Sequence, residues 1–374
     1  MNFNIQRNVL LDNLLIVQKA LSTKTPAPYL QGIKLEVYEK EVVMVTSNAD
    51  ISIKISIKDE SLDVKEKGNV LIPGRFFVDI VRKLDGDTVS FSMFENNMLK
   101  LVSKNSDVTL NLLDIDDYPE IDFVVNEHPI PIETKVMKAI IRQTTFATSV
   151  IENRPILTGV NIRVDKQNLV ATATDSFRLS QKVIDIPKNF DEMNVVIPGK
   201  SLDELIKIFE EDLEEILIHL NHQSILFEYG NVLFQSRLLE GNFPETSRLV
   251  PKEFPIVIKF DRTTLMTAVD RAALLSQRDS STSIVKLELK ENDVVEITST
   301  SPEIGKVVEE VHPSEKPEGS PIKIAFSSKY FLEALRTFSA DQVMVKFTGE
   351  VRPFVIESEK DKDLTELILP VRTE

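Results

Sequence analysis

The residues that could carry out chemistry in this chain of 374 residues are few and widely spaced. The chain contains no cysteine, which excludes disulfide bonds and thiolate chemistry. It also lacks a phosphate loop of the Gly-x-x-x-x-Gly-Lys type and a dinucleotide loop of the Gly-x-Gly-x-x-Gly type. These patterns indicate no catalytic centre, and we expect no metal ion and no other cofactor.

Three small groups of polar residues still invite a catalytic or metal-binding interpretation. His219 and His222 stand three residues apart, but on a strand this spacing points the side chains to opposite faces, so we expect solvent-exposed histidines. The acidic pair at positions 116–117 is explained equally well by an acidic loop. Asp175 and Arg178 are predicted to form an ion pair that shapes a site without acting as catalytic groups.

The pattern that organises the chain is a strand-to-helix unit that occurs three times. In the central copy a short apolar run is followed by a predicted helix over 198–210, with Pro198 at its first position. An apolar stripe at i, i+3, i+4 and i+7 begins at Leu202. Stripes with the same spacing begin at Phe77 and at Phe331. The intervals of 125 and 129 residues predict three copies of one domain.

Each copy is predicted to hold a second helix and several antiparallel strands. The further helices span 7–21, 133–148 and 261–276, and alternating strands span 33–37, 160–164 and 285–289. Helices with one apolar stripe can hide it only against a sheet, which predicts an α+β fold of three tandem two-layer domains. We place these domains at 1–125, 126–250 and 251–374, with proline-containing joints between them and a charged loop over 59–68.

The charge of the chain is unevenly distributed. The total is −15, which argues against nucleic acid binding, yet the six predicted helices carry +5 and the remainder carries −20. A domain of this size has a radius of gyration of about 14 Å, so six in a ring leave a hole about 36 Å wide, which admits a DNA duplex. Two chains would supply six domains, with the mildly basic helices turned inward.

At this point the chain resembles the bacterial DNA polymerase III beta subunits, the sliding clamps. The resemblance covers the whole chain and rests on the threefold repeat together with five short segments in order. These segments are RPILTG at 154–159, ATDSFRL at 173–179, LEGNFP at 239–244, RAALLS at 271–276 and LPVR at 369–372. It implies a DNA-clamp fold and a head-to-tail homodimeric ring of six domains that encircles duplex DNA and slides along it.

The resemblance also implies a pocket between the second and third domains that binds a short apolar motif of partner proteins. Most of its walls are apolar, and it includes guanidinium groups suited to an acidic end. Its residues would be Leu157, Thr174, Ser176, Phe177, Arg178, Leu179, Pro244, Arg248, Leu249, Val351, Pro353, Leu369, Pro370, Val371 and Arg372. Two features depart from the family, which often has His at the position of Phe177 and an apolar last residue in place of Thr373-Glu374.

For DNA, the resemblance points to Lys24 and Lys200, and position in the repeat adds Arg75, Arg82 and Lys207. For the dimer interface it points to Val108, Leu110, Leu274 and Leu275, with acidic residues at 303, 309 and 310 facing basic residues at 75, 100 and 104. Charged pairs of this kind contribute little energy, but they fix the orientation of two chains.

The function implied is that of a non-catalytic DNA replication processivity factor. Its implied partners are double-stranded DNA, the alpha subunit of DNA polymerase III in its exonuclease-associated holoenzyme, a clamp loader, and repair polymerases, mismatch repair proteins and ligase. No apolar run is long enough to span a membrane and the N-terminus is typical of a strand, so we expect a cytoplasmic, nucleoid-associated protein. The alternatives are a passive repeat scaffold that binds only proteins, and a hydrolase or transferase with an unrecognised site.

Overall fold

A computed structural model describes residues 1–22, 25–94, 97–165, 167–186, 190, 192–209, 214–275 and 283–372. The chain forms two compact units, one of residues 1–137 and 200–238 and the other of residues 138–199 and 239–374. Within the described residues the helices are α1 Arg7–Val17, α2 Gly74–Lys83, α3 Thr134–Thr144, α4 Gly199–Leu205, α5 Arg262–Ala273 and α6 Ser328–Thr337. Short 3-10 helices span Gln18–Ala20, Pro28–Gln31, Thr145–Ala147, Pro155–Thr158 and Ile206–Ile208.

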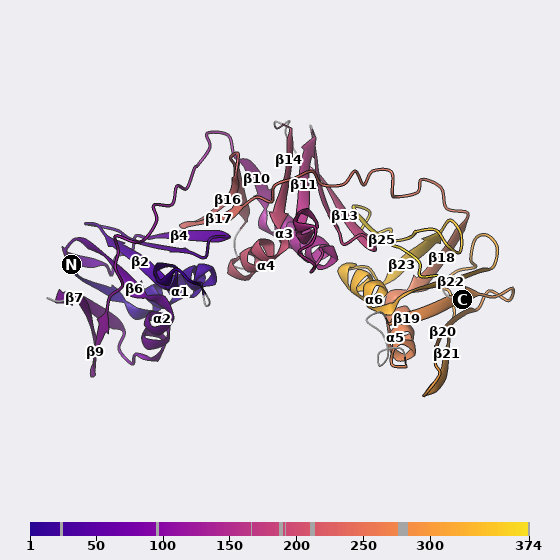
Figure 1. The fold of residues 1–374 in the computed structure, drawn as a ribbon, viewed down its shortest axis with the longest axis horizontal. Helices are drawn as coiled ribbons and strands as arrows, with labels where there is room; N and C mark the ends of the chain where they lie inside the picture. The colour runs from indigo at the N-terminus through magenta and orange to yellow at the C-terminus, as the bar shows by residue number, and fades with distance from the viewer. Residues whose placement is uncertain are drawn as a thin grey trace. The chain divides into compact units, whose positions relative to one another are not determined.

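The first unit contains a five-stranded sheet and an eight-stranded sheet, both antiparallel (Figure 1). The five-stranded sheet has the order β5-β1-β7-β8-β9, with β1 Asn2–Gln6, β5 Asp63–Glu66, β7 Thr88–Phe94, β8 Met98–Ser103 and β9 Ser106–Asn111. The eight-stranded sheet has the order β10-β15-β16-β17-β4-β3-β2-β6, with β2 Gly32–Val37, β3 Val42–Ser47, β4 Ile51–Ile57, β6 Gly68–Pro73, β10 Ile130–Glu133, β15 Glu215–Leu220, β16 Ser224–Tyr229 and β17 Val232–Arg237. Helices α1 and α2 pack on each other and, between them, on strands of both sheets.

The second unit also contains two antiparallel sheets. The eight-stranded sheet has the order β14-β11-β12-β13-β25-β24-β23-β18, with β11 Gly159–Asp165, β12 Asn168–Thr174, β13 Arg178–Asp185, β14 Met193–Pro198, β18 Ile256–Asp261, β23 Gln342–Phe347, β24 Phe354–Glu357 and β25 Leu364–Ile368. The four-stranded sheet has the order β21-β20-β19-β22, with β19 Ile284–Leu289, β20 Val295–Ser301, β21 Gly305–Val311 and β22 Ile322–Ser327. Helices α5 and α6 pack on each other and on strands of both sheets.

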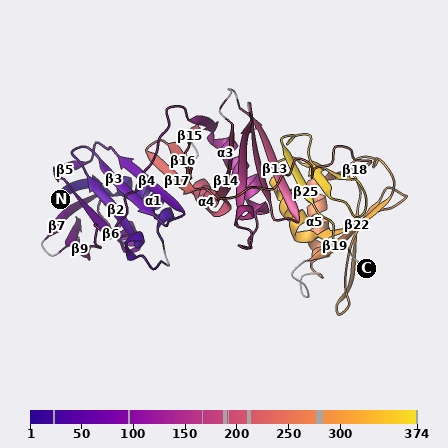
Figure 2. The ribbon, with the colours of Figure 1, turned by 45° about the horizontal axis from the view of Figure 1, so that its top comes forward.

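The join between β13 and β25 makes one sheet out of strands from two predicted domains. Arg178 pairs with Ile368 and Lys182 with Leu364, in an antiparallel register of five residue pairs (Figure 2). In the first unit β4 and β17 make the equivalent join, from Val232 opposite Ile55 to Ser236 opposite Ile51. Neighbouring repeats are therefore connected through main-chain hydrogen bonds of a continuous sheet.

The apolar stripes predicted from the sequence lie in the core. Phe331, Ala334 and Leu335 of α6 are buried against Phe326 and Phe354, whose rings pack on that of Phe331. Burying an aromatic side chain of this size contributes about 2–3 kcal/mol. Helices α5 and α6 also have side-chain N-caps, since the Asp261 carboxylate accepts the amide of Thr264 at 2.8 Å and the Ser327 hydroxyl accepts that of Tyr330 at 3.4 Å.

The prediction that Pro198 opens a helix was wrong by one residue. Pro198 is the last residue of β14 and pairs with Gly159, just as Pro73 closes β6 opposite Gly32. The backbone of Pro73 has a ψ of 102°, which is extended, so the helix begins at the following glycine. A Cβ at Gly159 would lie 2.6 Å from the carbonyl oxygen of Ile197, which explains glycine opposite this proline.

Two other expectations are corrected in the first unit. The charged segment 59–68, expected to be a loop, contains β5, which pairs with β1 at the edge of its sheet. His219, expected to be exposed, is buried on β15, where its Nδ1 accepts the backbone N–H of Asn126 at 2.9 Å. Since a backbone amide can only donate, Nε2 carries the proton and donates to Glu228 at 2.9 Å. His222 lies in the turn after β15 and is exposed, as predicted.

Candidate functional site

The site is organised by a turn at residues 174–178, between β12 and β13. The Thr174 hydroxyl donates to the carbonyl of Arg178 at 2.6 Å and accepts the amide of Ser176 at 3.1 Å. One oxygen of Asp175 accepts the amides of Phe177 and Arg178 at 2.9 and 3.0 Å. Ser176 has a φ of +77°, a left-handed conformation that costs about 1 kcal/mol or more and that these bonds maintain. The turn projects the Phe177 ring outward, 58% exposed.

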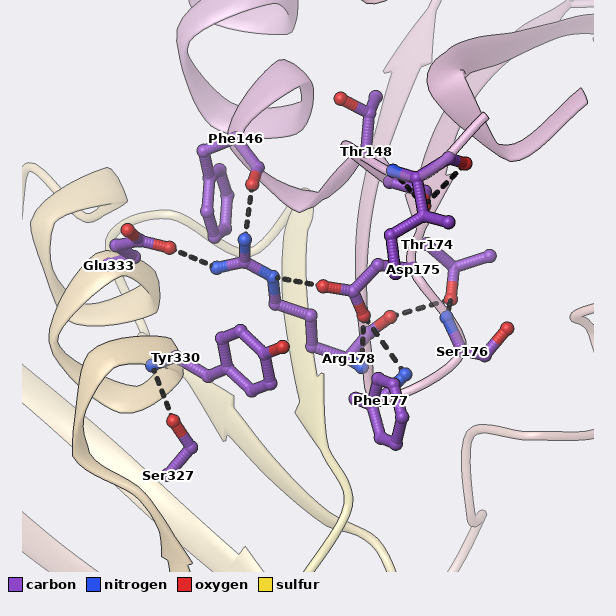
Figure 3. A network of polar contacts seen from close by, with 12 residues as sticks. Phe146, Thr148, Thr174, Asp175, Ser176, Phe177, Arg178, Ser327, Tyr330 and Glu333 are labelled. Carbon is purple, nitrogen blue, oxygen red and sulfur yellow. Dashed lines mark hydrogen bonds and ion pairs between the residues drawn. The ribbon is translucent and has the colours of Figure 1, made fainter. Parts of the chain in front are cut away.

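The side chain of Arg178 points inward and connects three elements of the second unit (Figure 3). Its Nε donates to Asp175 at 3.1 Å, its Nη2 to the carbonyl of Phe146 at 2.5 Å, and its Nη1 to Glu333 of α6. The guanidinium carbon lies 4.9 Å from the ring centroid of Phe146 and 4.5 Å from that of Tyr330. Phe146 belongs to the 3-10 helix after α3, and Tyr330 belongs to α6.

This geometry changes the interpretation of Arg178. The residue is 8% exposed and each of its three nitrogens already has an acceptor. A buried arginine with such partners holds structure together, and its charge is not free for a ligand. Arg178, predicted as a pocket residue, is thus buried and already paired, and its role toward a ligand stays a prediction. It positions Phe177 and Ser176, whereas the predicted ion pair with Asp175 is confirmed at 3.1 Å.

A fully buried carboxyl group lies in the same region of the sheet, on β25. Glu366 Oε1 is 3.0 Å from the hydroxyl oxygen of Ser180 and 3.1 Å from that of Thr337. Each hydroxyl has a single proton and a shorter bond to a backbone carbonyl, Ser180 to Gln143 at 2.5 Å and Thr337 to Ala334 at 2.7 Å. A protonated Glu366 carboxyl has one O–H and can donate to only one of these two hydroxyls. Burial raises the pKa of Glu366 well above its ordinary value, although hydrogen bonds from the two hydroxyls and the charge of Arg178 oppose the change.

A cavity of about 770 Å³ opens in the second unit beside this region. One wall is the segment that leads into β18 (residues 248, 249, 251 and 253–255), and the other is the β23–β24 loop (residues 348, 352 and 353). The ring of Phe254 packs on a buried cluster of Leu179, Val355 and Leu367, so that wall is fixed to the eight-stranded sheet. The result is a concave site whose lining combines apolar side chains with charged and polar ones.

The predicted pocket residues fall into three groups. Arg248, Leu249 and Pro353 line the cavity directly. Phe177, Leu249 and Val351 are large apolar side chains that are 58%, 48% and 67% exposed. The third group is buried within the unit and consists of Leu157, Thr174, Arg178 and Leu179.

The C-terminal segment of the predicted pocket is held by main-chain bonds. The amide of Leu369 donates to the carbonyl of Phe177 at 2.9 Å, and the amide of Val371 donates to that of Ala325 at 2.7 Å. Leu369 and Pro370 are half-buried, and Arg372 is exposed. Pro244 and Ser176 are exposed in the same unit, and Thr373-Glu374 lies outside the described residues.

Sequence reasoning missed several residues of the cavity. Pro251, Glu253, Phe254, Pro255, Thr348 and Arg352 line it and were not expected there. Pro251 and Pro255 belong to one of the predicted proline-containing joints. The signal that could have identified them is the apolar Phe254 between two prolines, because a large exposed ring in a linker needs a surface to pack on.

The residues predicted to face DNA are exposed where the structure describes them. Arg75 and Arg82 lie on α2, Lys200 on α4 and Lys207 on the following 3-10 helix. Arg82 is 3.3 Å from Asp79 and Lys207 is 2.6 Å from Glu204, so their charges are partly neutralised within the chain. Lys24 lies outside the described residues.

Two of the predicted dimer residues lie on the edge strand β9, and the other two follow helix α5. Val108 and Leu110 are half-buried on β9, Leu275 is half-buried after α5, and Leu274 is 62% exposed. Of the charges expected to meet across an interface, Glu309 already pairs with Arg271 of the same chain at 2.5 Å, and Lys100 with Asp107 at 2.6 Å. The bond from Arg271 also lowers the pKa of Glu309.

Among the residues that the structure describes, no three His, Asp or Glu side chains gather in a way that could hold a metal ion. The same residues include no helix long and apolar enough to cross a membrane.

Comparisons with known proteins agree over the whole chain. Family models of the DNA polymerase III beta subunit match in order, the N-terminal domain at residues 1–122, the central domain at 131–245 and the C-terminal domain at 247–372. The beta sliding clamp of Staphylococcus aureus (strain Mu50) is 42% identical, and that of Staphylococcus epidermidis is 41% identical, each over 100% of both chains. The crystal structure of the DNA polymerase sliding clamp from Bacillus subtilis superposes with a TM-score of 0.96 at 40% identity, covering 100% of both chains.

These findings confirm the resemblance and the α+β fold of three tandem clamp domains. The boundaries 1–125, 126–250 and 251–374 stay predictions, as do the roles of the individual site residues.

Replacing Arg178 with alanine should destabilise the second unit. The change leaves the carboxylates of Asp175 and Glu333 without their buried partner, which costs about 3 kcal/mol. Urea unfolding monitored by circular dichroism measures the loss. Arg163→Ala is the matched control because it removes an exposed arginine from β11 in the same unit. Equal unfolding midpoints for the two variants would contradict the assigned role.

Replacing Glu366 with glutamine should stabilise the protein in a pH-dependent way. Because the folded-state pKa of Glu366 lies above that of the unfolded chain, wild-type stability is full below about pH 4.5 and falls as the pH rises toward the folded-state value. The variant lacks this loss, so its stability advantage over the wild type should grow by at most about 1.4 kcal/mol for each pH unit. Thermal unfolding of both proteins from pH 4 to pH 8 tests this. An advantage that does not change with pH would refute a protonated Glu366.

Proposed function

Because the chain belongs to the DNA polymerase III beta subunit family, the sliding clamps, it is a non-catalytic processivity clamp, and we propose that it works as a homodimeric ring around duplex DNA. Partner proteins dock in the cavity of the second unit and are thereby tethered to the template. Its partners are the polymerase III alpha subunit, a clamp loader and other proteins with a clamp-binding motif, and its location is the cytoplasm, on the nucleoid.

The observation that carries the ring proposal is a pair of unpaired sheet edges. Strand β9 ends the five-stranded sheet and β21 ends the four-stranded sheet, and neither has a partner on its outer side among the described strands. Free edges of this length are liabilities that proteins usually cover or use for association. Pairing β9 of one chain with β21 of another satisfies both edges, and two such joins close a ring of two chains.

Apolar side chains beside these edges support the same arrangement. Val108 and Leu110 alternate on one face of β9, and Val308 on β21 is exposed. Leu274 follows α5, which packs on β21. Burying such residues on association supplies the apolar centre that stable homodimer interfaces require.

Contact with DNA is proposed to be weak and independent of base sequence. Exposed lysine and arginine side chains on helices meet phosphates without reading bases. Arg75 and Lys200 have no ion pair among the described residues, so we assign them larger shares than Arg82 and Lys207, whose charges have acidic neighbours. Lys24 belongs to the same set by resemblance alone. Weak contacts of this kind allow sliding, while the closed ring prevents escape.

Tethering of partners is assigned to the cavity and its exposed rim. Phe177, Leu249 and Val351 supply apolar contact area, and the fixed wall at Phe254 supplies shape. An extended peptide with leucine and phenylalanine side chains matches this chemistry.

Leu274→Glu should convert the dimer to a monomer, because a carboxylate would be buried in the apolar part of the interface without a partner. Sedimentation velocity at micromolar concentration measures the change. Val150→Glu is the matched control, since Val150 is 94% exposed in the same unit and belongs to neither β21 nor α5. A monomeric wild-type protein, or a dimer that survives the Leu274 change, would contradict the ring.

Leu249→Ala should weaken binding of a synthetic peptide with a Gln, Leu and Phe motif by about threefold to tenfold, because it removes apolar contact area from the cavity wall. Fluorescence anisotropy with labelled peptide and full-length protein gives the affinity. Val183→Ala, an exposed apolar residue of β13 that does not line the cavity, should leave it unchanged. Equal affinities for the two variants would remove Leu249 from the site.

A further inference from the structure

The two joins between repeats have the same topology but different side chains at one matching position. In the first unit Ile53 of β4 lies opposite Phe234 of β17, and both are fully buried. In the second unit Ser180 of β13 lies opposite the buried Glu366 of β25. The positions match because Ile53 and Ser180 each follow by four residues the left-handed residue of the preceding turn. The fold therefore does not require a polar pair here, and burying a carboxyl group costs free energy that an apolar pair does not.

The polar pair connects the ends of two helices from different parts of the chain. The Ser180 hydroxyl donates to the carbonyl of Gln143 on α3 at 2.5 Å, and the Gln143 amide nitrogen donates to the carbonyl of Thr337 on α6 at 2.9 Å. Glu366 Oε1 lies 3.0 Å from the Ser180 hydroxyl and 3.1 Å from that of Thr337. We call Gln143, Ser180, Thr337 and Glu366 the Glu366 cluster.

The protonation state of Glu366 decides where the hydroxyl protons of the cluster point. A protonated carboxyl donates to one hydroxyl, while Ser180 and Thr337 keep their bonds to the carbonyls of Gln143 and Ala334. An ionised carboxylate only accepts, so both hydroxyls must turn toward it and leave those carbonyls. Both carbonyls belong to the last four residues of their helices, where an α-helix supplies no partner of its own. Ionisation therefore weakens the end of each helix at the join.

We propose that the Glu366 cluster makes the partner-binding site pH-dependent, because it holds α3, α6 and the joined strands together firmly only while Glu366 is protonated. This inference rests on the proposed tethering function and names a way in which that function is regulated. The connection to the site is the sheet itself. Leu179 and Leu367, the sequence neighbours of Ser180 and Glu366, lie opposite each other and pack with Phe254 of the cavity wall. A change in the position of these two strands therefore moves that wall.

The charges around the cluster leave a proton as the means of neutralising Glu366. Both cations on β13 have carboxylate partners of their own, Arg178 in the network of Figure 3 and Lys182 with Asp363 at 2.6 Å. Among the described residues Glu366 takes part in no ion pair, and burial raises its pKa although the two hydroxyls and Arg178 oppose this. On β24 the residue opposite Glu366 is the apolar Ile356. The titratable residues that lie near the cluster in the other elements are Arg178 and Lys182 on β13, Tyr330, Glu333 and Arg336 on α6, and Lys138 and Arg142 on α3.

The first test measures peptide affinity against pH in full-length protein. The labelled peptide carries the Gln, Leu and Phe motif, is blocked at both ends and has no titratable side chain, and fluorescence anisotropy follows its binding from pH 6 to pH 9. The affinity of the wild type should fall by about threefold to tenfold as the pH rises past the folded-state pKa of Glu366. Glu366→Gln should keep its low-pH affinity over the whole range, because an amide cannot ionise. A flat wild-type profile would overturn the inference.

Glu291→Gln is the matched control, because it makes the same chemical change at an exposed residue between β19 and β20 of the same unit. Its profile should follow that of the wild type, and a flat profile in this variant would assign the effect to overall charge and overturn the inference.

Thr337→Val separates a proton-dependent role from a merely structural one. The change removes a hydroxyl that can donate to the ionised carboxylate, so the fall in affinity should move to higher pH. An affinity lowered by the same factor at every pH, with the transition unmoved, would show a structural role only and overturn the inference.

Hydrogen exchange in peptide-free protein separates this inference from the function on which it rests. After correction for the intrinsic pH dependence, exchange of the β25 amides should increase with pH in the wild type and not in Glu366→Gln. Equal exchange in both proteins at every pH overturns the role of the cluster and leaves the tethering function standing. The expected exchange, with no peptide binding at any pH, overturns the tethering function and with it the regulation of the site.

Discussion

The buried guanidinium of Arg178 is the interaction on which the geometry of the candidate site depends. It fastens the turn at 174–178 to the 3-10 helix after α3 and to α6, and it is the shared partner of Asp175, Glu333 and two aromatic rings. A charge can be kept in such a place only when all its donors are satisfied. These contacts hold a turn in which Ser176 has a left-handed conformation and Phe177 points outward.

The candidate site combines buried residues that hold its shape with exposed apolar residues. Thr174, Leu179 and Glu366 lie within the unit and take part in the continuous sheet, while Phe177, Leu249 and Val351 face solvent. Exposed apolar side chains lower the solubility of a protein unless a ligand covers them. When the residues that support them are held in place, these side chains keep one arrangement and lose less conformational entropy on binding. The site thus separates buried residues on β12, β13 and β25 from exposed ones, which lie in the turn at 174–178, before β18 and in the β23–β24 loop.

The sequence was informative about the repeat and less so about what joins the copies. Apolar stripes beginning at Phe77, Leu202 and Phe331 predicted the helices, because a helix that buries one face needs apolar residues at helical spacing. The strands that connect copies were not predicted, although β4 alternates clearly between buried and half-buried residues. Residues far apart in the chain meet where β13 pairs with β25 and where Arg352 and Arg248 line one cavity. Local sequence patterns do not indicate such long-range contacts. His219 was misjudged for the same reason, since its partner Asn126 is 93 residues away.

Joining repeats through a shared sheet has a mechanical consequence. Within one chain, bending between the strands of β13 and β25 would break a ladder of main-chain hydrogen bonds and expose Glu366 beneath it. In the proposed ring, the joins between separate chains lack the covalent connection and the buried arginine that reinforce this one. Strain applied to the ring would therefore concentrate where two chains meet, and the ring would open there before the sheet within either chain came apart.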